Sequence, residues 1–147
     1  MENFKFRLQN VLDFKLKNED QCKIKYSKTQ NEKKVVEEEL KTLKSNYEKY
    51  ALEIDVEDTI ERRITSNYLT FISNMIDKTK LELNEKKLLE NEARLDLLNK
   101  QIERKSLEKL KEDKYSSYKK IVAQKEQSIN DEFGIYSYFR NTCLLYT

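Results

Sequence analysis

The chain has 147 residues with no proline, one glycine and 38% charged residues. Because glycine and proline supply most turns and helix stops, this composition excludes a compact fold that turns often and favours a few very long helices. Only 37% of the residues are hydrophobic, too few for a globular core but enough for the narrow apolar stripes of coiled-coil helices. The formal net charge of +2 at pH 7 argues against a disordered chain.

The types of side chain argue against an enzyme. The sequence has two cysteines, Cys22 and Cys143, far apart, and no histidine, which does not fit the usual zinc patterns or a histidine-based triad. It also lacks a phosphate-binding GxxxxGK[ST] loop, so we expect no cofactor and no ATP chemistry of its own. No apolar run reaches membrane-spanning length, which predicts a soluble protein.

The first predicted helix runs from about residue 4 to about residue 54. Apolar side chains recur in it at alternating steps of four and three, the heptad spacing of a coiled-coil seam. These positions are Val36, Leu40, Leu43, Tyr47, Tyr50 and Ile54. Backward, the same register reads Lys33, Thr29, Tyr26, Cys22, Glu19, Lys15, Leu12 and Leu8. Because this stretch is largely polar, we expect loose packing around residues 15–33.

A turn is predicted at residues 55–59, where acidic side chains cluster and Asp58 with Glu61 has the spacing of a capping box. The second helix is expected over residues 60–133, up to Gly134. Its apolar set shows a register drift between Lys78 and Leu88, which predicts a stutter. That set includes Ile60, Ile64, Phe71, Met75, Leu88, Leu95, Leu98, Ile102, Leu107, Leu110, Tyr118 and Ile121.

Together these elements predict an all-α fold: two long helices in an antiparallel coiled-coil hairpin, with the second helix longer than the first. Residues 1–140 would form a single domain and residues 141–147 a loose tail. A bend near residue 57 places Phe4 beside Leu110 and leaves residues from about Lys111 to Arg140 without a partner in the chain. That stretch is rich in apolar side chains, so we expect another protein to cover it. The isolated protein should be monomeric.

Two terminal motifs resemble a known family. The run from Phe4 to Leu12 resembles the opening motif of FliJ, the small coiled-coil component of the bacterial flagellar export apparatus. The run from Arg104 to Glu112 resembles that family's ERKxLEKLKE stretch, and residues 125–127, 131–133 and 139–140 resemble its closing pattern. The resemblance covers nearly the whole chain and implies a fold like the coiled-coil stalk of the ATP synthase gamma subunit.

The resemblance also implies partners and a location. The paired termini would dock into the hexameric ring of the export ATPase FliI, and the end near the turn would contact the export gate protein FlhA. Export chaperones would be further partners, and the protein would be cytoplasmic and peripherally associated with the membrane at the flagellar base. The implied ATPase-ring residues are Phe4, Phe6, Arg7, Leu8, Gln9, Val11, Leu107, Leu110, Tyr118 and Ile121. The implied gate residues are Leu43, Tyr50, Phe71 and Met75.

Two other functions remain open at the level of sequence. The same architecture would serve as the stalk protein of a virulence type III secretion system, or as a coiled-coil spacer that dimerises through its unpartnered end. A nucleic-acid partner is disfavoured, because acids interleave with the lysines and arginines between Arg104 and Lys125 and lower the positive potential there.

Overall fold

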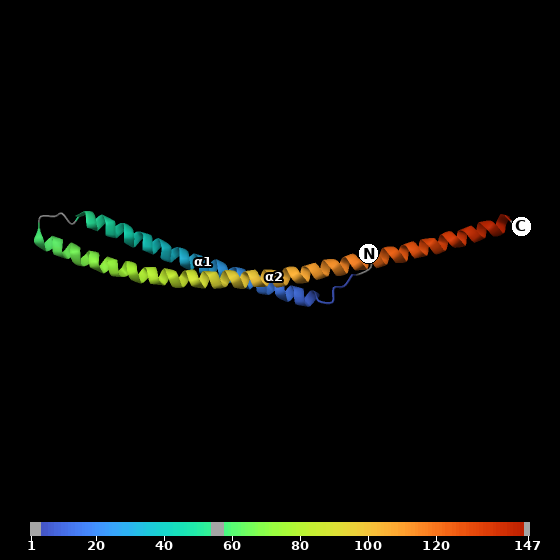
Figure 1. The fold of residues 1–147 in the computed structure, drawn as a ribbon, viewed down its shortest axis with the longest axis horizontal. Coiled ribbons are helices and arrows are strands. Elements are labelled where there is room, and N and C mark those ends of the chain that lie inside the picture. The colour runs from blue at the N-terminus through green and yellow to red at the C-terminus, as the bar shows by residue number, and fades with distance from the viewer. Residues whose placement is uncertain (1–3, 54–57, 146–147) are drawn as a thin grey trace. The chain divides into compact units, whose positions relative to one another are not determined.

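The computed structural model of the protein describes residues 4–53 and 58–145. Two α-helices account for nearly all of this part of the chain, α1 over Gln9–Leu52 and α2 over Thr59–Leu145. Figure 1 shows the two helices, and the described residues form no strand. The predicted all-α class with a longer second helix is therefore confirmed.

The two helices pack against each other in opposite directions. The rings of Tyr50 and Tyr68 have centroids 4.8 Å apart. Farther back along α1, Lys33 pairs with Glu90 at 2.7 Å, and Lys15 pairs with Glu103 at 2.9 Å. Position numbers fall on α1 as they rise on α2, which confirms the antiparallel hairpin.

The contacts divide the chain into two units. The central unit is Lys17–Gln101, and the terminal unit combines Met1–Leu16 with Ile102–Thr147. Helix α2 runs through both.

The α1 side of the seam follows the predicted register. Each predicted seam position from Leu8 to Tyr50 is buried or half-buried except Tyr47, which is 37% exposed. Ile54, the last predicted position, lies outside the described residues. The prediction succeeded on α1 because its most regular apolar run, from Val36 to Tyr50, fixes the register of the polar positions before it.

The α2 side of the seam differs from the prediction. The buried positions are Leu69, Ile72, Ile76, Thr79 and Leu83, and the same heptad continues through half-buried Lys86 and Glu90 to buried Ala93. This repeat is unbroken, so the predicted stutter is wrong. Because several seam positions hold polar or small side chains, the apolar residues of the sequence do not mark this heptad repeat. Of the predicted set, only Met75, Leu107 and Tyr118 are half-buried, and the others are exposed.

The core of the central unit is an aliphatic cluster formed by both helices. It contains Val36, Leu40, Ile72, Ile76 and Leu83. Leu43 and Tyr50 pack against it while remaining partly accessible. Full burial of one such side chain stabilises a fold by about 1.5–3 kcal/mol, so this cluster holds the helices together in the central unit.

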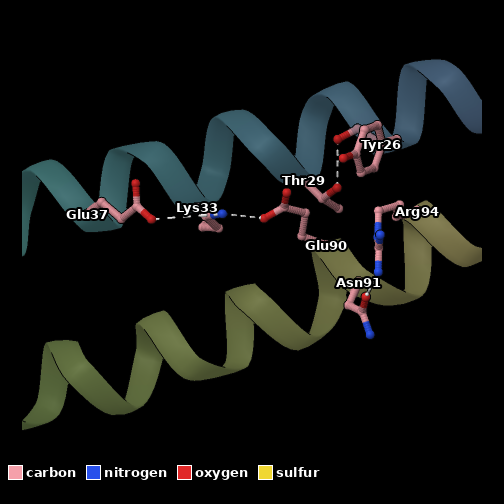
Figure 2. A network of polar contacts seen from close by, with 7 residues as sticks. All are labelled: Tyr26, Thr29, Lys33, Glu37, Glu90, Asn91 and Arg94. Carbon is pink, nitrogen blue, oxygen red and sulfur yellow. Dashed lines mark hydrogen bonds and ion pairs between the residues drawn. The ribbon is translucent and has the colours of Figure 1, made fainter.

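Charged pairs replace aliphatic contacts farther along the central unit. Figure 2 shows Lys33 on α1 between Glu37 of its own helix and Glu90 of α2. The Nζ atom of Lys33 lies 2.7 Å from Glu90 Oε2 and 3.9 Å from Glu37 Oε1, and Lys86 donates to Glu32 at 3.5 Å. The hydrogen bond to Glu90 raises the pKa of Lys33 above its ordinary 10.5. Partly exposed ion pairs stabilise less than aliphatic burial does.

Helix α1 begins at Gln9, five residues later than predicted. The first helical hydrogen bond runs from the Leu12 amide to the Leu8 carbonyl at 2.9 Å. Residues 4–8 read FKFRL and contain no Ser, Thr, Asp or Asn that could cap a helix start. This segment is non-helical, so it reaches farther along α2 than the same number of helical residues would.

Helix α2 begins at Thr59, and Asp58 caps its first turn. The Asp58 carboxylate accepts a hydrogen bond from the Ile60 amide at 3.1 Å, and the Asp58 carbonyl accepts from the Arg62 amide at 3.0 Å. The Asp58 side chain therefore satisfies the Ile60 amide, a donor that has no partner within the helix. Residues 54–57, which hold most of the predicted turn, lie outside the described residues.

The expected end of α2 at residue 133 is wrong, because the helix passes through Gly134 and ends at Leu145. A glycine in a helix costs only about 1 kcal/mol relative to alanine, and no proline follows it. Residues 141–145 are therefore helical, and they include most of the expected loose tail.

The raised pKa of Lys33 predicts how the thermal stability of the fold changes at high pH. Because the folded state binds the Lys33 proton more tightly, this stabilisation is complete below the ordinary pKa of 10.5 and is lost as the pH rises through the raised value. We expect Lys33→Met to lose less thermal stability across that range than the wild type, measured by circular dichroism. The exposed neighbour Lys34 provides the control, since Lys34→Met should keep the wild-type pH dependence. Equal losses in the wild type and Lys33→Met would contradict the Lys33–Glu90 contact.

Candidate partner-binding surfaces

The terminal unit holds its N-terminal segment against α2 through an aromatic cluster. The ring of Phe4 lies 5.2 Å from that of Tyr115 and 5.5 Å from that of Tyr118, both tilted. The Nζ atom of Lys119 lies 4.7 Å from the centroid of the Tyr115 ring, in the range of a cation–π contact. Phe4 thus anchors residues 4–8, which α1 itself does not hold in a helix.

A groove with an apolar floor and a basic rim lies beside this cluster. Its volume is about 460 Å³, and it lies between the N-terminal segment and α2. Its lining residues are Phe4, Lys5, Phe6, Arg7, Leu8, Leu110 and Lys114. Since the charged lining residues are all cations, the groove fits an apolar side chain flanked by acidic groups.

The ten predicted ATPase-ring residues all lie in the terminal unit. Five of them form the groove: Phe4, Phe6, Arg7, Leu8 and Leu110. The exposed members of the ten are Arg7, Val11, Leu110 and Ile121. The half-buried members are Phe4, Phe6, Leu8, Gln9, Leu107 and Tyr118. The side-chain amide of Gln9 donates a hydrogen bond to Asp13 Oδ1 at 2.9 Å. Contact of any of the ten residues with a partner remains a prediction.

Sequence reasoning left Lys5, Lys114 and Tyr115 out of this surface. The helical overlap was expected to end near Leu110, whereas Phe4 reaches Tyr118. Tyr115 stands three residues before Tyr118, a spacing that places both on one helix face. That spacing was the signal available in the sequence.

The distal part of α2 presents an uncovered apolar stripe. Every side chain from Ala123 to Asn141 is exposed, and Figure 1 shows this part of α2 continuing beyond the N-terminal segment with no other described segment beside it. Ile129, Phe133 and Tyr136 follow one another at steps of four and three and line a shallow pocket with Glu132. The overhang predicted from the sequence is therefore present, although it begins after Tyr118 rather than at Lys111.

The four predicted gate residues lie in the central unit, and their side chains differ in how exposed they are. Leu43 and Tyr50 pack on the aliphatic core, and Tyr50 meets Tyr68 edge-to-face at an interplanar angle of 80°. Met75 is half-buried, whereas Phe71 is 60% exposed. Phe71 is thus the member of the four most available to a partner, and Leu43 and Tyr50 hold the helices together.

The described residues hold no group of three or more metal-ligating side chains placed to bind an ion. Cys22 is half-buried and Cys143 is exposed. In the same part of the chain, neither helix contains a stretch long and apolar enough to cross a bilayer.

Comparison with known proteins identifies the family. The family described as Flagellar FliJ protein matches residues 4–142. The chain belongs to the FliJ family. No curated protein and no solved structure matches it. FliJ-family membership gives the protein a role related to flagellar export and an association with export components in general. The family's members are non-catalytic helical stalk proteins.

The aromatic cluster predicts how the N-terminal segment responds to proteolysis. Phe4→Ala removes the ring that packs on Tyr115 and Tyr118, so residues 4–8 should leave α2 more often. Trypsin should then cut after Lys5 and Arg7 several-fold faster than in the wild type, measured by mass spectrometry of the released ends. Phe14→Ala is the matched control, because Phe14 is exposed on α1. Equal cleavage rates in the wild type and Phe4→Ala would show that the cluster does not anchor the segment.

Proposed function

We propose that this FliJ-family protein binds the ring of the export ATPase FliI through its terminal unit and the export gate protein FlhA through its central unit. In this role it links the ATPase to the gate and assists the handover of chaperone-bound cargo. The observation that carries the proposal is the uncovered part of α2 from Ala123 to Asn141. A helix with an apolar stripe and nothing to cover it requires a partner to be stable.

The ring contact is supported by the combination of surfaces in the terminal unit. The overhang offers Ile129, Phe133 and Tyr136, and the groove, which lies earlier on α2, offers a cationic rim with Arg7 and Lys114. A partner cavity with apolar walls and acidic residues would suit both surfaces. A single helical end inside a sixfold ring contacts its subunits unequally, so it can favour some conformational states of the ATPase over others.

The gate contact is supported by exposed aromatic side chains near the start of α2. Phe71 is exposed, and Tyr68, three residues before it, is 39% exposed, although its ring also contacts that of Tyr50. Aromatic side chains on a rigid helix are frequent binding anchors. The proposed location is the cytoplasmic face of the membrane at the flagellar base, where both partners would be reached.

The family match favours flagellar export over a virulence secretion system, since the matching family is the flagellar one. A spacer that dimerises through its overhang makes a different prediction, because its self-association would depend on Phe133 and Ile129.

The ring contact is tested by changing exposed residues only. We expect Arg7→Glu with Phe133→Asp to weaken binding to FliI at least about tenfold, since it reverses a rim charge and puts a charge in the apolar stripe. Titration with purified FliI, with the stimulation of its ATPase as a second readout, measures this. Arg62→Glu with Ile24→Asp is the control, with the same kinds of change at exposed positions of the central unit. Wild-type binding and stimulation by the first variant would show that the terminal unit does not bind the ring.

The gate contact is tested at Phe71. Phe71→Ala should weaken binding to the cytoplasmic domain of FlhA about tenfold while leaving FliI binding unchanged. Because Phe71 is exposed, the thermal midpoint should change little. Val35→Ala, at an exposed apolar position on α1, should bind FlhA like the wild type. If Phe71→Ala also bound FlhA normally, the gate surface would have to lie elsewhere.

A further inference from the structure

A second apolar stripe runs along α2 in the central unit. Leu81, Leu88 and Leu95 follow one another at intervals of seven residues, with Leu98 after them. All four are exposed, at 68%, 66%, 47% and 49% in chain order. Regular heptad spacing of leucines is the pattern by which one helix packs against another. The proposed ATPase and gate surfaces do not include this stripe.

The stripe faces away from α1. Leu81 precedes the buried Leu83 by two residues, and Leu88 precedes the half-buried Glu90 by two. At about 103° per residue in a coiled coil, two residues correspond to a rotation of about 206°, so the two faces are nearly opposite. Another helix can therefore pack on the stripe without displacing α1.

The charges beside the stripe complement those of a second copy. Lys80, Lys87 and Arg94 flank it on one side, and Glu85 and Glu92 flank it on the other. In a parallel pair of helices each basic position faces the acidic position five residues farther along the other helix. Lys80 would then face Glu85 of the second copy, and Lys87 would face Glu92. An antiparallel pair would place lysine against arginine and glutamate against glutamate.

The described structure leaves these charges available. Lys80, Lys87, Glu85 and Glu92 are exposed. Arg94 donates to Asn91 on its own helix at 2.8 Å, as Figure 2 shows. Asn84 and Asn91 take the stripe positions between the leucines. Asparagine inside such a seam lowers its stability and fixes its register.

From these features we infer that α2 of the central unit carries a self-association surface, on which two copies pack in parallel through Leu81, Leu88, Leu95 and Leu98. Few leucines and two asparagines per copy make the association weak. The dilute protein is a monomer, as the sequence predicts, and it pairs where its local concentration is high.

The first experiment tests the leucines in the full-length chain. Sedimentation equilibrium from low micromolar to several hundred micromolar should show the average mass of the wild type rising with concentration. Leu88→Gln with Leu95→Gln should remain a monomer throughout and keep its helical circular dichroism. Ile24→Gln with Val35→Gln is the matched control on exposed apolar positions of α1 and should associate like the wild type. A constant monomer mass in the wild type would overturn the inference.

The second experiment tests the orientation. Lys80→Glu with Lys87→Glu should not associate with itself, and neither should Glu85→Lys with Glu92→Lys, because each places like charges across a parallel seam. A mixture of these two variants should associate again, since each supplies the charge that the other lacks. Stronger self-association of the first variant would indicate an antiparallel pair and overturn the inference. Loss of association in Ile129→Gln with Phe133→Gln would overturn it as well, because it would place the contact on the overhang.

The two experiments are independent of the proposed function. A variant that loses self-association but still binds FliI and FlhA supports both proposals. Failure of FliI or FlhA binding in the variants designed for those partners leaves the self-association result intact.

Discussion

The antiparallel contact between α1 and α2 is the interaction on which the rest of the structure depends. In the central unit it rests on Val36 and Leu40 from one helix and Ile72, Ile76 and Leu83 from the other. Long helices with so few hydrophobic residues obtain most of their stability from such a seam rather than from helix propensity. The seam also sets the register, and the register determines which side chains of α2 remain accessible to partners.

The seam between α1 and α2 changes in composition along its length, and this change affects which side chains are exposed. Aliphatic packing gives way along the central unit to pairs such as Lys33 with Glu90 and Lys86 with Glu32. These charged positions occupy the face of α2 that packs on α1, so several leucines of the same helix lie on its other faces. Many large apolar side chains of α2 are therefore exposed, which suits a protein of the FliJ family that associates with export components.

The terminal unit is held together in a different way, because the chain before Gln9 is not helical. Phe4 packs on Tyr115 and Tyr118 and so places the N-terminal cations against α2 near these two tyrosines. The groove and the uncovered stripe then belong to the same unit.

The sequence by itself determined the all-α class, the two-helix count, the α1 seam and the Asp58 cap. Each of these depends on composition, on a regular heptad or on one capping residue, and not on contacts between distant parts of the chain. The overhang also follows from the order of residues. Only the tertiary structure decided the α2 face, since Thr79, Lys86, Glu90 and Ala93 occupy a seam that no apolar pattern marks. It also decided that α2 continues past Gly134, because the helix on both sides of this glycine stays intact. Phe4 reaches Tyr118 because the non-helical segment before Gln9 extends farther per residue than a helix does.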